Sequence, residues 1–332
     1  MTRISVIIPS NHGHHDLLKI VRAICQQTVK PAEIVIVDSS RECDACPAEV
    51  TTQCTVSGVH LIYVHLAQAL PGQARNIGLE LAGAELIAFI DVQTIPRPNW
   101  LEISYQLLCS SGVAGVWGAT YFKADTTFER LIRDGFHGIQ LCRTLPGSVF
   151  DRKVFAKVGQ FVGWVRAGED TEWMLRFVLL NVPVVFPSLA LIDYVGLIGS
   201  DMKSLLRKWY RNYMASRDLP HFFPQKLLLW LILYPLLLLI AFNWNYLIAD
   251  WRMDSPFYIG HVTKIVVVLP VLAYLVMRGL WLPLMRGVPI RHLLPIRFFA
   301  IMLICFMADV VKVLVFSIPT RKQYVSSQNH ES

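Results

Sequence analysis

The chain has 332 residues, 54% of them hydrophobic, and its mean hydropathy is +0.45. This composition excludes a purely water-soluble protein and predicts that part of the chain lies in lipid. The net charge is +7, but the basic residues concentrate after residue 200, beside apolar segments. We therefore expect them to face an anionic membrane surface, and we expect no nucleic-acid partner.

The N-terminal segment has no basic start followed by a long apolar stretch, so it does not resemble a signal peptide. We therefore expect the first two hundred residues to stay in the cytosol. Seven scattered cysteines, an odd number, indicate free thiols rather than a disulfide framework. Cys43 and Cys46 form a single C-x-x-C, a spacing that also occurs in zinc and redox sites.

Short β-branched runs alternate with helical patterns over residues 1–200. The predicted strands are 4–9, 33–38, 60–66 and 85–91, and the helices between them include 14–27 and 73–82. This order predicts an α/β fold with a mostly parallel central sheet covered by helices on both faces. Ligands bind such sheets beyond the carboxyl ends of the strands, where Pro9, Asp38 and Asp91 fall.

The stretch PGQARN, 71–76, combines a glycine, a cation and an amide before a helical pattern: Gly72, Arg75 and Asn76. Glycine-rich turns and helix starts bind phosphate oxygens through backbone N–H groups. The stretch matches neither the dinucleotide fingerprint nor the P-loop. It predicts a close approach of the backbone to a neighbour, with phosphate as one candidate.

Glu169 and Asp170 stand at the predicted start of a helix, and Glu172 can pair with Arg176 four residues later. Acids favour helix N-termini for structural reasons alone. An acid in a crevice beside a bound sugar is also suited to remove a proton from an acceptor hydroxyl. The local sequence leaves both interpretations open.

Apolar and aromatic residues recur at helical spacing over 203–217, while Arg207, Lys208 and Arg211 fall mostly on the opposite face. This pattern predicts an amphipathic helix in the membrane interface; an ordinary packed helix with a solvated basic face is the alternative. We assign 201–226 to this helix and a linker.

Three apolar segments of about twenty residues follow, the length that crosses a hydrocarbon core. They are 227–248, 257–277 and 298–318, within a membrane domain at 227–320 that precedes a tail at 321–332. Arginines gather in the second connecting loop, so the positive-inside rule places that loop and the N-terminal domain in the cytosol, at the cytoplasmic membrane. The same count places the C-terminus outside, although Arg321 and Lys322 favour the opposite side.

Charged side chains inside these segments need partners. Asp309 and Lys312 are three residues apart and can pair along one helix face. His261 and Lys264 belong to the second segment. They fit contacts to a lipid phosphate or to another subunit, which would make a homo-oligomer through the membrane helices, and they equally fit snorkelling and helix packing.

Five motifs in order, SVIIPS, EIVIVDSS, GQARNIGLELAGAELIAFID, PRPNWL and AGEDTEWMLRF, strongly resemble the family 2 glycosyltransferases of the GT-A fold over about residues 3–190. The resemblance implies transfer of a sugar from a nucleotide-sugar donor with inversion at the anomeric carbon. It implies a nucleotide pocket formed by Pro9, Asn11 and Asp38 and supported by Arg75 and Asn76. Asp91 would open the D-x-D turn, Asp170 would be the general base, and Glu169 would set the acceptor.

The D-x-D turn normally holds Mg²⁺ or Mn²⁺, but here it is Asp91-Val92-Gln93. An amide is a weaker ligand for a hard cation than a carboxylate. Three explanations remain: the ion binds through Asp91, the diphosphate and the Gln93 carbonyl; Arg75 and other cations replace the ion; or donor turnover is lost. We favour the first and expect a weakened metal dependence.

A membrane domain beside the catalytic domain predicts a lipid-linked acceptor, either a polyprenyl-diphosphate glycan or polyprenyl phosphate, in cell-surface polysaccharide or glycan assembly. Arg207, Lys208 and Arg211 would hold its phosphate. A processive polysaccharide synthase is the first alternative, although the sequence lacks a Q-x-x-R-W motif. A non-catalytic membrane scaffold is the second, and Gln93 is the argument for it.

Overall fold

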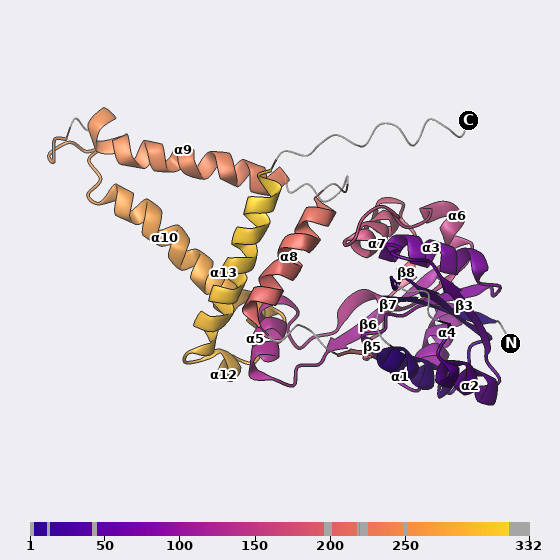
Figure 1. The fold of residues 1–332 in the computed structure, drawn as a ribbon. Coiled ribbons are helices and arrows are strands. Elements are labelled where there is room, and N and C mark those ends of the chain that lie inside the picture. Colours follow the sequence, from indigo (N-terminus) through magenta and orange to yellow (C-terminus); the bar gives the residue numbers. More distant parts are fainter. Residues whose placement is uncertain are drawn as a thin grey trace, which may run out of the picture.

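Strands and helices alternate up to residue 194 in the computed structural model, which describes residues 3–11, 14–41, 45–195, 201–217, 219, 225–248 and 251–318 (Figure 1). Cys43 and the predicted tail, 321–332, lie outside these residues. The strands are β1 (Ile4–Ser10), β2 (Glu33–Asp38), β3 (His60–His65), β4 (Leu86–Phe89), β5 (Thr94–Pro96), β6 (Gly115–Phe122), β7 (Cys142–Asp151), β8 (Val184–Val185) and β9 (Ile192–Tyr194). The helices among them are α1 (His14–Cys25), α2 (Ala48–Ser57), α3 (Pro71–Leu81), α4 (Trp100–Ser111), α5 (Thr127–Phe136), α6 (Val154–Val158) and α7 (Glu169–Leu179).

One sheet orders these strands as β3-β2-β1-β4-β7-β6-β9-β5, with β8 beside β6. β1 pairs in parallel with β2 and β4, and β2 pairs in parallel with β3. The predicted parallel arrangement is confirmed for these four strands. β7 runs antiparallel to both β4 and β6, which makes the second half of the sheet mixed.

Helices cover both faces of the sheet, as predicted, because side chains alternate along each buried strand. Val6 and Ile8 of β1 belong to a core that includes side chains of α1 and α4. Ile7, between them, belongs to a second core with side chains of α3 and α7. This second core is rich in aromatic rings, among them Phe150, which meets Trp173 at 5.2 Å in an edge-on geometry.

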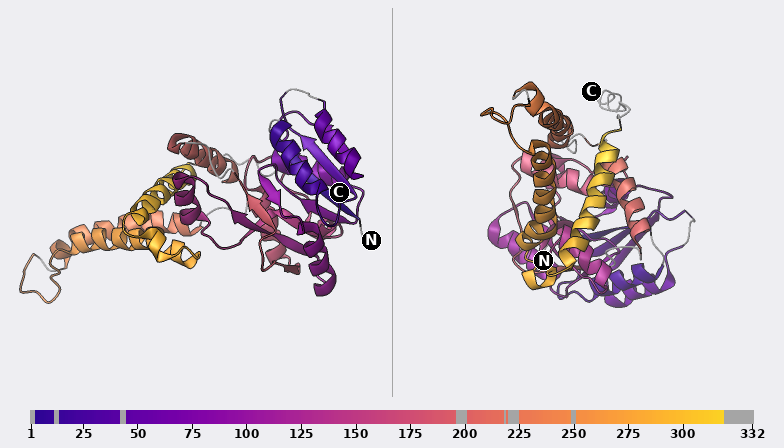
Figure 2. Two further views of the ribbon diagram at one scale, coloured as in Figure 1. Left: turned by 90° about the horizontal axis from the view of Figure 1, so that it is seen from below. Right: turned by 90° about the vertical axis from the view of Figure 1, so that its left-hand side faces the viewer.

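A helical arm follows the sheet domain. It comprises α8 (Met202–Ser216), α9 (Gln225–Leu247), α10 (Val262–Val276), a π-helical turn η1 (Met277–Trp281), α11 (Leu282–Met285), α12 (Ile290–Leu293) and α13 (Arg297–Phe316). α9, α10 and α13 lie on one side of the sheet, with α5 and α8 between (Figures 1 and 2). Leu205 of α8 packs in one apolar cluster with Ile132 of α5 and Ile304 of α13. Within the arm, α8 therefore packs between α5 of the sheet domain and α13.

Two helical stretches are long and apolar enough to cross a membrane, judged by length and composition within the described residues. They are Lys264–Met285, with 22 residues, and Arg297–Phe316, with 20. α9 coincides with the first predicted segment, whose role as a span stays a prediction.

The stretch Lys264–Met285 is displaced from the predicted segment 257–277, because the chain ahead of it is held in a loop. Asn245 donates to the carbonyl of Ile259 and accepts from its N–H, at 2.9 and 3.0 Å. Helix α10 consequently begins at Val262, and the helical path continues through η1 to Met285.

Asp309 does not form the predicted contact along its own helix. Its carboxylate accepts hydrogen bonds from Tyr274 at 2.8 Å and from Arg278 at 2.9 Å, so the ion pair links α13 to α10 and η1. Arg278 also lies over the ring of Phe136 in α5, 5.9 Å from its centroid, which is close enough for a cation–π contact. The acid is satisfied between helices because Arg278 reaches it from the end of the neighbouring span.

Candidate active site

A cavity of about 790 Å³ opens beyond the carboxyl ends of β1 and β4. This is where ligands enter sheets of this kind. The structure brings most of the predicted site residues to its wall: Pro9, Asn11, Arg75, Asp91, Gln93, Glu169, Asp170, Lys208 and Arg211. We call it the first cavity.

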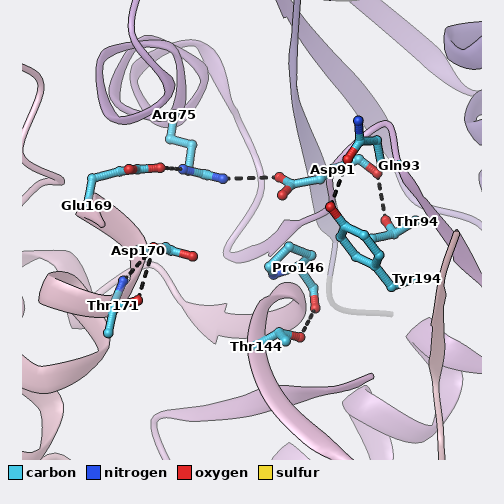
Figure 3. Close-up of polar contacts among 10 residues, drawn as sticks. All are labelled: Arg75, Asp91, Gln93, Thr94, Thr144, Pro146, Glu169, Asp170, Thr171 and Tyr194. Carbon is cyan, nitrogen blue, oxygen red and sulfur yellow. Dashed lines mark hydrogen bonds and ion pairs between the residues drawn. The ribbon is translucent and has the colours of Figure 1, made fainter. Parts of the chain in front are cut away.

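Arg75 lies between two carboxylates in the first cavity (Figure 3). It donates to Glu169 Oε1 at 2.6 Å and to Asp91 Oδ1 at 3.1 Å. Its side chain and that of Glu169 are only 5% and 6% exposed, whereas Asp91 is 33% exposed. Such a buried cation fixes the position of both acids, since removing it would leave a carboxylate buried without its partner.

Burial and charge act against each other in this cluster. Burial lowers the pKa of Arg75, but Asp91, Glu169 and Asp170 outweigh it and raise the pKa above its usual value. Burial raises the pKa of Glu169, and Asp170 adds to this while Arg75 opposes it. Within the described residues, Glu169 Oε2 has no hydrogen-bond partner although it is buried.

Close packing of α3 on the loop before α7 creates the Arg75 cluster. A Cβ at Gly72 would collide with the carbonyl oxygen of Val162, so the sequence signal at Gly72 marks contact with this loop. Asn76 lies outside the lining of the first cavity. Its amide donates to the carbonyl of Phe161 and accepts from its N–H, both at 2.9 Å, which holds the same loop.

The loop ends at Gly168, whose φ of +92° is rarely adopted by other residues. A Cβ there would press on Ser216, 3.0 Å away, and on Leu219, 3.1 Å away. Helix α7 therefore begins against the end of α8. Asp170 lies in its first turn and accepts from the Thr171 N–H at 2.7 Å. The predicted pair of Glu172 with Arg176 is present, at 2.5 Å.

The turn after β4 is closed by Thr94, whose hydroxyl donates to the carbonyl of Asp91 at 2.6 Å. The Gln93 side-chain oxygen accepts a hydrogen bond of 2.7 Å from the Tyr194 hydroxyl (Figure 3). Burial, with Asp91 and Asp170 nearby, raises the pKa of Tyr194 to about 12. Tyr194 is therefore a stable hydrogen-bond donor to Gln93 at neutral pH.

A divalent ion fits this turn only in part. Among the described residues, no three His, Cys, Asp or Glu side chains form a group that could hold a metal. Asp91 has one oxygen paired with Arg75, and the Gln93 oxygen already accepts from Tyr194. Mg²⁺ is commonly held by one or two carboxylates together with substrate phosphates. The residues therefore fit a divalent ion for which Asp91 is the protein ligand and a substrate diphosphate supplies most of the other ligands.

A second cavity of about 600 Å³ adjoins the first. Five residues line both: Asp91, Asp170, Tyr194, Lys208 and Asn212. Toward the helical arm, apolar side chains of α5 and α8 line it: Ile132, Phe136, Leu205 and Trp209. We call it the second cavity; it extends from Asp170 to the apolar cluster that includes Ile304 of α13.

Helix α8 supplies cations to the first cavity. Lys208 and Arg211 line it, and burial lowers the pKa of Lys208, with Arg211 lowering it further. Arg207 is exposed and is not among the residues that line either cavity. The predicted basic cluster is therefore divided between the cavity and the surface.

Asp38 also lies outside the lining. Its carboxylate accepts from the Ser40 hydroxyl and from the Tyr63 hydroxyl, both at 2.8 Å. Its neighbour Ser39 and, further on, Arg41 line the first cavity.

Cys46 is half-buried, and burial raises the pKa of its thiol.

The polar cavity residues that the sequence did not predict include Arg41, Arg166, Tyr194 and Asn212. Arg166 stands three residues before Glu169, so its closeness to the acidic pair was a usable signal. Asn212 follows the predicted Arg211 directly. Tyr194 gave no local signal, because the three-residue strand β9 reaches the site only through its pairing with β5 and β6.

Residues 5–164 match the family model "Glycosyl transferase family 2". The glycosyltransferase AglE of Haloferax volcanii is 27% identical over 187 residues, which cover 52% of this chain and 60% of that protein. The pre-mycofactocin glycosyltransferase of Mycobacterium tuberculosis is 24% identical over 225 residues, covering 62% and 44%. The chain thus spans about half the length of these relatives.

Among solved structures, a mannosyltransferase from Pyrobaculum calidifontis, in complex with GDP-Man and Mn²⁺, superposes with a TM-score of 0.53. It is 15% identical and the match covers 94% of this chain and 87% of that one, a likeness of fold alone. Together with the family match, this identifies the fold expected from the sequence. Residues 5–164, just under half of the chain, carry a glycosyl transferase family 2 domain, on a GT-A-like α/β fold.

Proposed function

We propose that this chain is a membrane-bound, inverting glycosyltransferase that moves a sugar from a nucleotide-sugar donor to a lipid-linked acceptor. One observation carries the proposal: Asp91 and Asp170 line both cavities, at the boundary between them. A donor in the first cavity and an acceptor in the second would meet at this boundary. The family match supports the reaction class.

The reaction needs a base on the acceptor side. Asp170 takes the proton of the acceptor hydroxyl as its oxygen attacks the anomeric carbon, and the bond from that carbon to the diphosphate breaks. Attack from the second cavity on a donor held in the first cavity would invert the anomeric centre. The buried Glu169 orients a hydroxyl through its unpaired oxygen.

The leaving diphosphate needs positive charge. Four cations line the first cavity besides Arg75: Arg41, Arg166, Lys208 and Arg211. They are suited to stabilise the charge that develops on the leaving group. A divalent ion, when bound beside Asp91, would supply further neutralisation. The first cavity therefore fits a nucleoside diphosphate with or without a strong metal site.

A lipid acceptor agrees with the path of the second cavity. Its apolar end lies against the cluster of α5, α8 and α13, and α13 is one of the two candidate membrane helices. A hydrocarbon chain can leave the second cavity along this cluster, while Lys208 stands where a lipid phosphate would lie. We place the reaction at the cytosolic face of the cytoplasmic membrane, following the arginine distribution of the loops.

A donor screen tests the proposal. Purified protein in vesicles of membrane lipid extract is given a panel of nucleotide sugars, and release of nucleoside diphosphate is measured. We expect turnover of a specific donor, and we expect Asp170→Asn to lower it by about 10² to 10⁴-fold, the usual contribution of a general base.

Two outcomes would contradict the proposal. The first is equal turnover by wild type and Asp170→Asn. The second is full support of a glycan-assembly pathway in cells by the Asn variant, which would make the chain a scaffold. Tyr121→Phe, on β6 outside both cavities, is the control that should keep wild-type turnover.

A further inference from the structure

The boundary between the two cavities contains an aromatic wall. Tyr194 lies in β9, directly opposite Thr94 of β5 on one side and Phe122 of β6 on the other. Its ring lines both cavities. Among the five side chains shared by the cavities, it is the largest without a charge. Its ring is therefore the largest uncharged surface at the boundary between the cavities.

Aromatic contacts hold this ring from behind. The rings of Tyr194 and Phe122 are 5.1 Å apart, and Phe122 stacks on His137 at 3.8 Å with an interplanar angle of 16°. Burial lowers the pKa of His137 to about 4, with Arg286 and Lys208 adding to the effect, so the stacked imidazole is neutral at physiological pH. The ring of Tyr194 is therefore backed by the stacked pair of Phe122 and His137.

The hydroxyl end of the ring is held by Gln93. Where the family motif would have a second acid, this chain has an amide whose oxygen accepts from Tyr194 at 2.7 Å. The backbone supports the contact, because the Val195 N–H donates to the Gln93 carbonyl at 3.0 Å. The turn that carries Asp91 is thus tied to the wall between the cavities.

We propose that Tyr194, held by Gln93, is a positioning residue that keeps water from the donor sugar and directs the acceptor to it. This proposal rests on the proposed function. In the competing reaction, a water oxygen bonds to the anomeric carbon as the bond to the diphosphate breaks. Its proton passes through Asp170 to solvent, and the electron pair leaves with the nucleoside diphosphate. A closed wall disfavours this hydrolysis relative to transfer.

The test measures the ratio of transfer to hydrolysis, which a merely structural role would leave unchanged. Three variants are compared with wild type in vesicles of membrane lipid extract: Tyr194→Phe, Gln93→Leu and the double variant. Total nucleoside diphosphate release and sugar incorporated into lipid are counted together. We expect the ratio to fall about 3- to 10-fold in each single variant, since each removes one hydrogen bond.

The double variant provides the sharper result. Because both changes remove the same contact, the double variant should be no worse than either single variant. Tyr194→Ala, which removes the ring as well, should lower the ratio further. The matched control is Tyr121→Phe, on the adjacent strand β6. The hydroxyl that it removes accepts from Arg133 at 3.4 Å, and Tyr121 lines neither cavity.

Two results separate this inference from the proposed function. If wild type transfers sugar but transfer and hydrolysis fall in parallel in all Tyr194 and Gln93 variants, Tyr194 is not a positioning residue. The inference also fails if the two single effects add in the double variant. If wild type turns over no donor at all, the proposed function itself fails.

Discussion

At the residue scale, the first cavity depends on one cation that serves two acids. Arg75 holds Glu169 and Asp91 in place. One of the two carboxylate oxygens of Asp91 is therefore already engaged by Arg75. The second acid of the family motif is replaced by Gln93, which faces Tyr194. Both features weaken a protein-based metal site and shift ion binding toward the diphosphate of the donor.

Restoring the acid should strengthen metal binding. We expect Gln93→Asp to bind Mn²⁺ about tenfold more tightly in the presence of a nucleoside diphosphate, because a carboxylate is the better ligand for a hard cation. Paramagnetic resonance of free Mn²⁺ measures this without turnover. Gln106→Asp, on α4 and outside both cavity linings, adds the same charge and should change nothing. A tight, absolute metal requirement in wild type would contradict the account.

The neutral His137 makes stability depend on pH. In the unfolded chain it takes up a proton near pH 6.5, and in the folded protein only near pH 4. The unfolded state therefore binds more protons between these values. The contribution of the neutral His137 to the free energy of unfolding is fully present above pH 6.5. It is lost as the pH falls to 4, by up to about 3 kcal/mol.

We expect the thermal unfolding temperature of wild type to fall across this window, and His137→Gln to show a flatter profile. His292→Gln removes a half-buried histidine of α12 and serves as the control. Parallel profiles for wild type and His137→Gln would overturn the assignment.

Sequence alone predicts the residues of the cavity that follow strands, and it fails for contacts made across the fold. Pro9, Asn11 and Asp91 converge because parallel strands end at one edge of a sheet. The pair of Glu172 with Arg176 is local and was also predictable. The partner of Gln93 was not, since Tyr194 is about a hundred residues away and no local pattern relates them.

At the element scale, α8 connects the site to the helical arm. One face packs on α5 and α13, and Lys208 and Arg211 reach the first cavity from another. Its end also lies against Gly168, immediately before the acids of α7. Amphipathic spacing predicted this helix from the sequence. Its place in the wall of the cavity depends on the packing of three separate segments and was beyond sequence patterns.

The cations of α8 should act on the donor. We expect the double variant Lys208→Ala, Arg211→Ala to raise the Kd for a nucleoside diphosphate about 30- to 700-fold, because each cation contributes roughly 1 to 2 kcal/mol to a bound phosphate. Calorimetric titration measures the Kd directly. Lys203→Ala removes an exposed charge from the same helix, outside both cavity linings, and is the control. An unchanged Kd in the double variant would mean that Lys208 and Arg211 do not bind the donor.

The helical arm shows how loop contacts limit a prediction from hydropathy. The apolar stretch beginning near residue 257 is long enough for a span. Trp244 and Asn245 hold Phe257 and Ile259 in a loop, however, and move the helix toward Met285. Asp309 likewise finds its partner Arg278 on another element, a choice that depends on how the helices pack.

At the scale of the whole molecule, the two cavities form a path from the carboxyl ends of β1 and β4 to the helical arm. The first is lined by cations and the second ends in apolar side chains beside α13. This polarity suits a charged, water-soluble donor on one side and a lipid-linked acceptor on the other.

The mass of the lipid product is the most direct test of this account. Wild-type protein in vesicles of membrane lipid extract is supplied with its donor, and extracted lipids are analysed by mass spectrometry. We predict one lipid species heavier by a single sugar residue, absent with Asp170→Asn. A ladder of many added sugars, or sugar incorporated only into water-soluble products, would contradict it.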